Sequence, residues 1–283
     1  MSDKGAVTTL MPPLGDGECA RPKRLRSRFY VRHVLPSDTH KFVGRIYDLS
    51  IVAYHFESYA QLAEHADCKY AFDVNGDLEA LVRRVESLNM VGDMLWPKPL
   101  PANFADFPIS RYEWLTVSAD VFLMRYISVV DCALILVNTV HETDLEPRKC
   151  SLENLKKGGV PGGVIDHLNR MLDDQGALRA ERNARFHHGE ERGFTQDDQS
   201  FRLGARFEAW GGGLTGCDRF GRKLNIERSF REGLVNLQGE FNRATRKLVR
   251  NLNLLYDLLF IEFETRFSPR FRAGPFGHLA RRK

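Results

Sequence analysis

The sequence lacks the cysteine patterns that mark metal-bound or disulfide-linked proteins. Its five cysteines are scattered and include no Cys-x-x-Cys pair: Cys19, Cys68, Cys132, Cys150 and Cys217. A structural zinc site and a disulfide framework are therefore not expected, and no metal or cofactor is predicted. Such cysteine usage is typical of proteins in a reducing cytoplasm.

Long apolar runs are also missing. The longest apolar segments are interrupted by charged residues, and the polar stretch from Met1 to Gly17 has no apolar core of a signal peptide. We therefore expect no membrane-spanning helix, no membrane partner and a cytoplasmic location.

A strong excess of one charge is absent, since the net charge is only +4. The distribution of charge is more informative. The stretch from Arg21 to Arg32 carries six basic residues with aromatic neighbours, and no acidic residue follows Glu264, where six basic residues remain. We expect a flexible basic arm at 1–35 and a basic tail at 268–283. Both suit phosphate backbones, although basic ends also serve solubility alone.

Apolar residues at helical spacing dominate the rest of the chain, so we predict a mainly all-α protein. In the region 36–108 one helix is expected from about His40 to Ala66, and a second follows a turn at Asn75-Gly76. Four prolines between Trp96 and Pro108 predict an extended linker that ends this N-terminal helical extension.

The region 109–267 is predicted to be a helical bundle. Two helices are expected at about 118–140 and 164–186, and a long amphipathic helix, or two with a break near Gly239, at about 226–267. Apolar residues from Phe201 to Ala209 alternate with polar residues or glycine, which predicts a short strand in a β or irregular insertion before the last helix. The excess of apolar residues from Leu252 to Phe263 favours a homodimer interface, with core packing as the alternative.

Chemistry-bearing residues gather at the end of the second bundle helix, in Arg182-Asn183-x-x-x-His187. Arginine neutralises phosphate charge, and histidine exchanges protons near neutral pH. Asn183 and His187 share a helix face, whereas Arg182 lies about 140° round from His187. The two can meet only if the arginine curls back or the helix ends between them.

This stretch resembles the signature of the HEPN superfamily, in which four to six residues separate an arginine from a histidine and asparagine often follows the arginine directly. The resemblance implies an α-helical, usually dimeric, metal-independent endoribonuclease in a toxin or anti-phage defence role. It covers about 118–267 and not the first hundred residues.

The resemblance implies catalytic roles for Arg182, Asn183 and His187 on RNA. His187 would take the proton of a ribose 2′-hydroxyl or protonate the leaving 5′-oxygen, with two His187 of a homodimer able to divide these roles. Arg182 would stabilise the charged transition state, and Asn183 would hold His187 or a phosphate oxygen. The expected products are a 2′,3′-cyclic phosphate and a 5′-hydroxyl. Arg185 and His188 fit substrate contacts.

Polar residues form one stripe along the first bundle helix: Asp120, Asp131, Asn138 and Glu142. Either the stripe faces solvent, or it faces the motif helix or a dimer partner, with Asp131 or Glu142 orienting Arg182 or His187.

Three alternatives remain at this stage. The first is a non-catalytic HEPN-like module that binds RNA, nucleotide or a protein, and the second is an unrelated helical interaction protein. A metal hydrolase built on His187, His188, Asp197 and Asp198 is disfavoured, because their spacing is not that of helical metal ligands. A regulatory protein or nucleic-acid trigger is a further expected partner.

Overall fold

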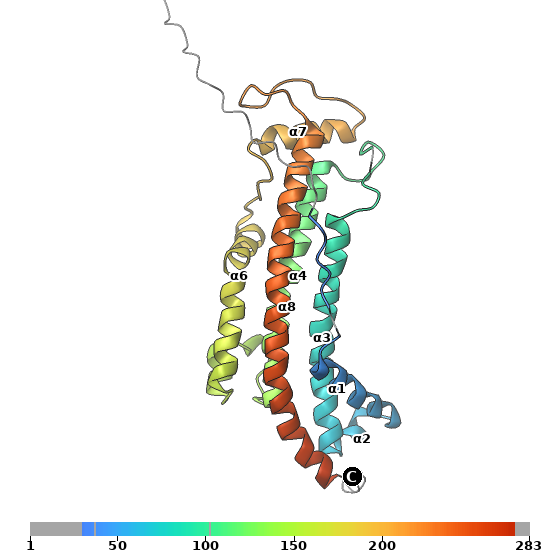
Figure 1. Cartoon of the computed structure of the whole chain (residues 1–283), viewed down its shortest axis with the longest axis vertical. Coiled ribbons are helices and arrows are strands. Elements are labelled where there is room, and N and C mark those ends of the chain that lie inside the picture. The colour runs from blue at the N-terminus through green and yellow to red at the C-terminus, as the bar shows by residue number, and fades with distance from the viewer. Residues whose placement is uncertain (1–29, 37, 102, 275–283) are drawn as a thin grey trace, which may run out of the picture.

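The protein is a bundle of long helices, seen here in a computed structural model that describes residues 30–36, 38–101 and 103–274 (Figure 1). These residues contain eight α-helices and no strand, which confirms the all-α prediction. The helices are α1 (Lys41–Ser50), α2 (Tyr59–Ala63), α3 (Ala66–Leu95), α4 (Arg111–His141), α5 (Leu152–Lys157), α6 (Gly162–His188), α7 (Asp198–Ala209) and α8 (Ile226–Ala273), with short 3₁₀ turns at Ile51–His55 and Pro147–Lys149.

Helix α4 is the centre of the bundle because it is apolar on nearly all sides. It contacts α3, α6, α7 and α8, and large side chains such as those of Phe122 and Tyr126 are fully buried. A reciprocal pair of hydrogen bonds between Ser110 and Glu113 fixes its first turn. Complete burial of each large apolar side chain contributes roughly 1.5–3 kcal/mol, so this helix is a main source of stability.

The turn expected at Asn75-Gly76 is not present, and of the two alternatives for the last helix the structure has the single long one. Helix α3 runs through Asn75 and Gly76 without a turn, and α8 passes Gly239 as one helix of 48 residues. Gly239 is buried under the ring of Tyr30, which lies 3.0 Å from the position a β-carbon would take. The absence of a side chain at Gly239 therefore lets the Tyr30 ring pack closely against α8, and the helix continues through this residue.

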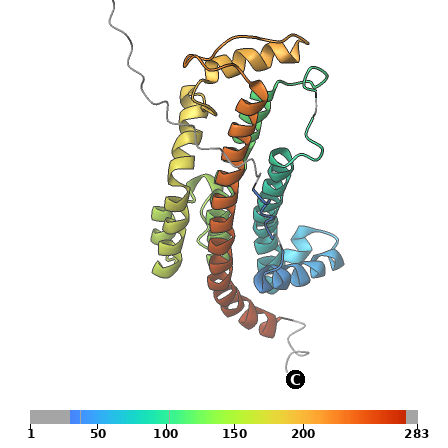
Figure 2. The ribbon, with the colours of Figure 1, turned by 45° about the horizontal axis from the view of Figure 1, so that its top comes forward.

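The strand predicted from Phe201 to Ala209 is wrong, because these residues belong to α7. Asp197 caps the helix by accepting a hydrogen bond from the Ser200 amide, and Phe201 and Ala205 bury one face at a spacing of four. Apolar residues at every second position also fall four residues apart, so the alternating pattern fits a helix with one buried face as well as it fits a strand. Figure 2 shows α7 crossing one end of the bundle. In the described residues, β pairing is limited to an isolated bridge between Cys217 and Lys223, which lies in the insertion before the last helix.

One hydrophobic core extends over both sides of the proline-rich segment. It joins Phe42 and Leu88 of the N-terminal region with Phe122, Leu168 and Phe241 of the later helices. The described parts of 36–108 and 109–267 therefore fold together. Residues 1–29 of the expected arm and 275–283 of the expected tail lie outside the described residues, while 268–273 continue α8.

Candidate functional site

The motif lies on the last two turns of α6, which stay helical through His188. Gly189 then adopts the left-handed conformation (φ 69°), and its amide donates to the carbonyl of Ala184. The helix does not end between Arg182 and His187, so the angle of about 140° between them persists. Arg182 shares its side of α6 with the buried Gln175, seven residues earlier, whereas His187 points to the opposite, outer side.

The motif side chains differ in exposure. Arg182 is half-buried, and Asn183, His187 and His188 are exposed. Within 30–36, 38–101 and 103–274, no hydrogen bond or ion pair engages the side chain of any of these four residues. One chain therefore presents the expected groups at a capped helix end but does not bring Arg182 and His187 together.

Arg185, predicted to contact substrate, is used inside the bundle. Its side chain is 7% exposed, and the guanidinium pairs with Asp120 of α4 at 2.5 Å and with Glu181 at 3.6 Å. Arg192 extends this network, because it lies 3.3 Å from Glu181 and pairs with Glu240 of α8. The substrate role of Arg185 is thus corrected to a structural one: its charge is already neutralised. Burial raises the pKa of Asp120, an effect that Arg185 opposes.

Asp131, a candidate orienting carboxylate, pairs with a different arginine. It accepts a hydrogen bond of 2.8 Å from Arg179, whose guanidinium also donates to Gln175 at 2.9 Å. Gln175 in turn donates to the carbonyl of Tyr126 at 2.7 Å. Asp131 therefore orients Arg179 and not Arg182 or His187. The sequence contained no signal for Arg179, because its partner depends on how α4 and α6 align.

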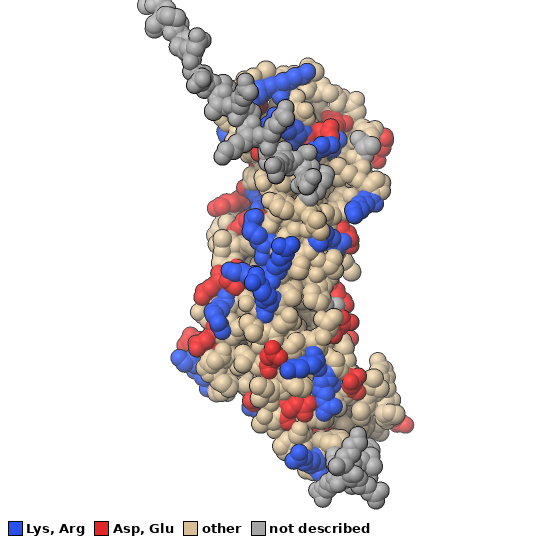
Figure 3. All heavy atoms as spheres, in the orientation of Figure 1, with Lys and Arg blue, Asp and Glu red and all other residues tan. Residues whose placement is uncertain are grey.

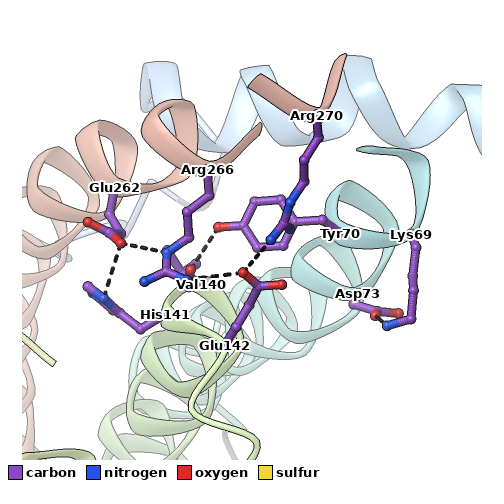
Figure 4. A network of polar contacts seen from close by, with 9 residues as sticks. All are labelled: Lys69, Tyr70, Asp73, Val140, His141, Glu142, Glu262, Arg266 and Arg270. Carbon is purple, nitrogen blue, oxygen red and sulfur yellow. Dashed lines mark hydrogen bonds and ion pairs between the residues drawn. The ribbon is translucent and has the colours of Figure 1, made fainter. Parts of the chain in front are cut away.

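Glu142, the second candidate carboxylate, directly follows the last residue of α4 and lies beside Arg266 and Arg270 (Figure 4). It follows Asp120 by 22 positions, which is roughly 33 Å of helix, so it cannot orient the motif. Its carboxylate instead accepts hydrogen bonds from Arg266 at 3.0 Å and Arg270 at 2.6 Å. Burial alone would raise the pKa of Glu142, but the hydrogen bonds from Arg270 and Arg266 outweigh it and lower the pKa.

The polar stripe of α4 thus divides between two ends of the molecule. Asp120 and Asp131 pair with arginines of α6, which agrees with the alternative in which the stripe faces the motif helix. Asn138 is buried and bonds instead to the backbone of Leu145, through its amide at 3.1 Å and its oxygen at 3.0 Å. Only the first two residues therefore belong to the neighbourhood of the motif helix.

A groove of about 750 Å³ lies near Glu142, far from the motif. Its charged lining is mainly acidic and includes Asp73, Asp77 and Asp144. Asp77 already accepts a hydrogen bond from Thr139, and Asp73 from Lys69. An acidic lining repels phosphate, so this groove does not suit an RNA backbone.

The two aspartates considered for a metal hydrolase have structural roles. Asp197 caps α7, and Asp198 accepts hydrogen bonds of 2.7 Å from the amides of Phe194 and Thr195. In the described part of the chain no cluster of three or more His, Cys, Asp or Glu residues is arranged to hold a metal ion.

No family model, curated protein or solved structure matched this chain. Among the described helices, none is long and apolar enough to span a membrane.

Proposed function

We propose that two copies of this chain form a metal-independent endoribonuclease, in which each site combines Arg182 of one copy with His187 of the other. The observation that supports the proposal is the exposed surface between these two residues. Phe186 and Asn183 follow Arg182 at about 40° and 100° around α6, and His187 follows at about 140°. Phe186 is 47% exposed, which is a large apolar surface for a position outside the hydrophobic core.

Helix α4 extends this apolar surface. Arg179 of α6 pairs with Asp131 of α4. Phe186 lies seven residues after Arg179, and Met124 lies seven residues before Asp131. Because α4 and α6 are antiparallel, both steps lead toward the same end of the bundle. Met124 is 49% exposed and Val117, another heptad on, is 43% exposed. Phe186, Met124 and Val117, here named the α4–α6 apolar face, suit contact with an identical face across a two-fold axis. A partner seated there would lie between Arg182 and His187.

The proposed reaction uses groups of the protein and its RNA. The ribose 2′-oxygen attacks phosphorus while His187 takes its proton, and the bond from phosphorus to the 5′-oxygen breaks. The 5′-oxygen leaves with a proton from water, giving a 2′,3′-cyclic phosphate and a 5′-hydroxyl. Arg182 of the other copy neutralises charge on the phosphorane-like transition state, and Asn183 hydrogen-bonds a phosphate oxygen. DNA lacks the attacking hydroxyl and should be spared.

The test is cleavage of a mixed single-stranded RNA in excess EDTA. We expect cyclic phosphate ends from the wild type, and a loss of at least a hundredfold in rate for Arg182→Ala and for His187→Ala/His188→Ala. The double variant prevents the neighbouring histidine from substituting for His187. Arg83→Ala, on an exposed part of α3, is the matched control and should cleave normally.

Mixing the two inactive variants, Arg182→Ala and His187→Ala/His188→Ala, tests whether the site is shared. Random pairing makes half of the dimers mixed, and each mixed dimer has one intact site of two. About a quarter of wild-type activity should return. No recovery on mixing would contradict a shared site, and unchanged cleavage by the variants would contradict the assignment of these residues.

A binding module without turnover is the second candidate function. It is favoured by the separation of Arg182 and His187 on one chain. Under this alternative, neither the wild type nor any variant cleaves RNA, while binding is retained.

A further inference from the structure

Positive charge gathers over the middle of α8, as Figure 3 shows. Exposed basic residues here are Arg243, Arg246, Lys247 and Arg250, and α8 contains no acidic residue from 241 to 256. Positions 243, 246 and 250 project from one side of the helix and span roughly 10 Å along its axis. We name Arg243, Arg246 and Arg250 the arginine face.

None of the three arginines of this face has a carboxylate partner among the described residues. Lys247 beside them pairs with Asp174 of α6, and Arg185, Arg192, Arg266 and Arg270 all take part in ion pairs. The Arg250 side chain donates instead to the backbone carbonyl of Arg246, at 3.3 Å. Three positive charges in succession without carboxylates repel one another, a cost that a bound polyanion would relieve.

An exposed aromatic ring borders the arginine face. Tyr30 is 49% exposed, and both its ring and the Arg243 guanidinium lie within 3.4 Å of the position that a β-carbon on Gly239 would take. The backbone that carries Tyr30 is fixed in place: the Trp96 indole donates to the Tyr30 carbonyl, and the Asn242 amide donates to the Val31 carbonyl at 2.8 Å. A held aromatic ring beside guanidinium groups offers a stacking surface for a nucleobase.

We propose that the arginine face and Tyr30 bind single-stranded RNA, with the arginines on successive phosphates and the Tyr30 ring against a base. The choice of RNA over DNA rests on the proposed function, whereas the binding itself does not need cleavage. Leu254, Leu258 and Ile261 are exposed on the following turns of α8, so an anionic membrane would also find basic and apolar groups here. The stacking ring beside the arginines favours the nucleic acid, because a lipid headgroup has no base to stack.

The experiment measures fluorescence anisotropy of a labelled oligouridine that is 2′-O-methylated throughout and so cannot be cleaved. Wild type is compared with R243Q/R246Q/R250Q and with a dispersed control of equal charge, R83Q/R148Q/R228Q. All six side chains are exposed, so the fold should tolerate both variants. We expect binding to weaken at least tenfold in the first variant and less than threefold in the control. The slope of log affinity against log salt should fall by about 2, because three phosphate contacts are lost. Tyr30→Ala should weaken binding severalfold.

Equal affinities for the two triple variants would overturn the proposal. So would loss of binding to phosphatidylserine vesicles, with RNA binding unchanged, in R243Q/R246Q/R250Q, because the face would then serve a membrane. Tighter binding of DNA than of RNA of the same sequence would overturn the choice of RNA. Because the probe cannot be cleaved, these outcomes are independent of the cleavage assay, and failure of one proposal leaves the other measurable.

Discussion

Arg185 shows how one residue can decide whether the motif helix is held in place. Its buried guanidinium bridges α6 to Asp120 of α4, and the adjoining pairs of Glu181 and Arg192 reach α8. Removal of the arginine leaves partly buried carboxylates without their positive partner. We expect Arg185→Ala to lower the free energy of unfolding by about 2 kcal/mol.

Urea unfolding followed by circular dichroism measures this effect. The control is Arg182→Ala, three positions earlier, which should change the free energy of unfolding by less than about 0.5 kcal/mol because no ion pair with described residues is lost. Equal stability of the two variants would contradict the structural role of Arg185.

At the scale of residues, the sequence predicted which side chains share a helix face better than it predicted which side chains pair with one another. The shared side of Asn183 and His187 follows from helical spacing alone, and α6 has that geometry. The partners of Arg185, Asp131 and Glu142 depend on the alignment of α4 with α6 and α8, which no local pattern encodes. Helical periodicity placed Glu142 on the same side of α4 as Asp131. A shared side does not mean shared partners, because the two residues lie at different heights along the helix axis.

At the scale of elements, close packing of α8 on α4 depends on Gly233. A β-carbon there would lie 2.5 Å from Leu115 of α4 and 3.0 Å from Phe194. Gly233→Ala should therefore force the helices apart and cost about 1–3 kcal/mol. Gly76→Ala is the matched control, since nothing lies within 4 Å of its β-carbon position and alanine is the better helix former.

We expect Gly76→Ala to raise the free energy of unfolding by about 0.5–1 kcal/mol. Thermal and urea unfolding of both variants measure the difference. A stabilised Gly233→Ala would mean that the two helices approach less closely than the structure indicates.

Helix existence was readable from the sequence wherever the apolar period was long, as in α4, α6 and α8. The misread elements share a cause. The turn predicted at Gly76 of α3 and the strand predicted in α7 both rest on local preference, which tertiary packing overrode. Gly239 is explained only by Tyr30, which is more than two hundred residues away in the sequence.

At the scale of the whole molecule, the α4–α6 apolar face predicts self-association. Met124→Glu/Phe186→Glu places charge on this face and should leave the chain monomeric at concentrations where the wild type is dimeric. Light scattering coupled to size-exclusion chromatography over a range of concentrations measures the mass.

The chain offers a matched control in Leu258→Glu/Ile261→Glu, on the exposed apolar turns of α8. This variant should remain dimeric, with RNA cleavage retained. If only the α8 variant became monomeric, the interface would lie on α8, where the sequence first suggested it, and Arg182 and His187 would not be joined across the dimer.

Helix α8 also determines when the chain can fold during synthesis. It supplies buried residues along the bundle from Phe230 to Phe267, and it is translated after every other described helix. The amide of His33 finds its acceptor on Asn242, 209 residues later. While the ribosome is still making α8, the apolar faces of α3, α4 and α6 have emerged without their common partner. We therefore expect these apolar faces to stay exposed, and open to aggregation, until α8 has been synthesised.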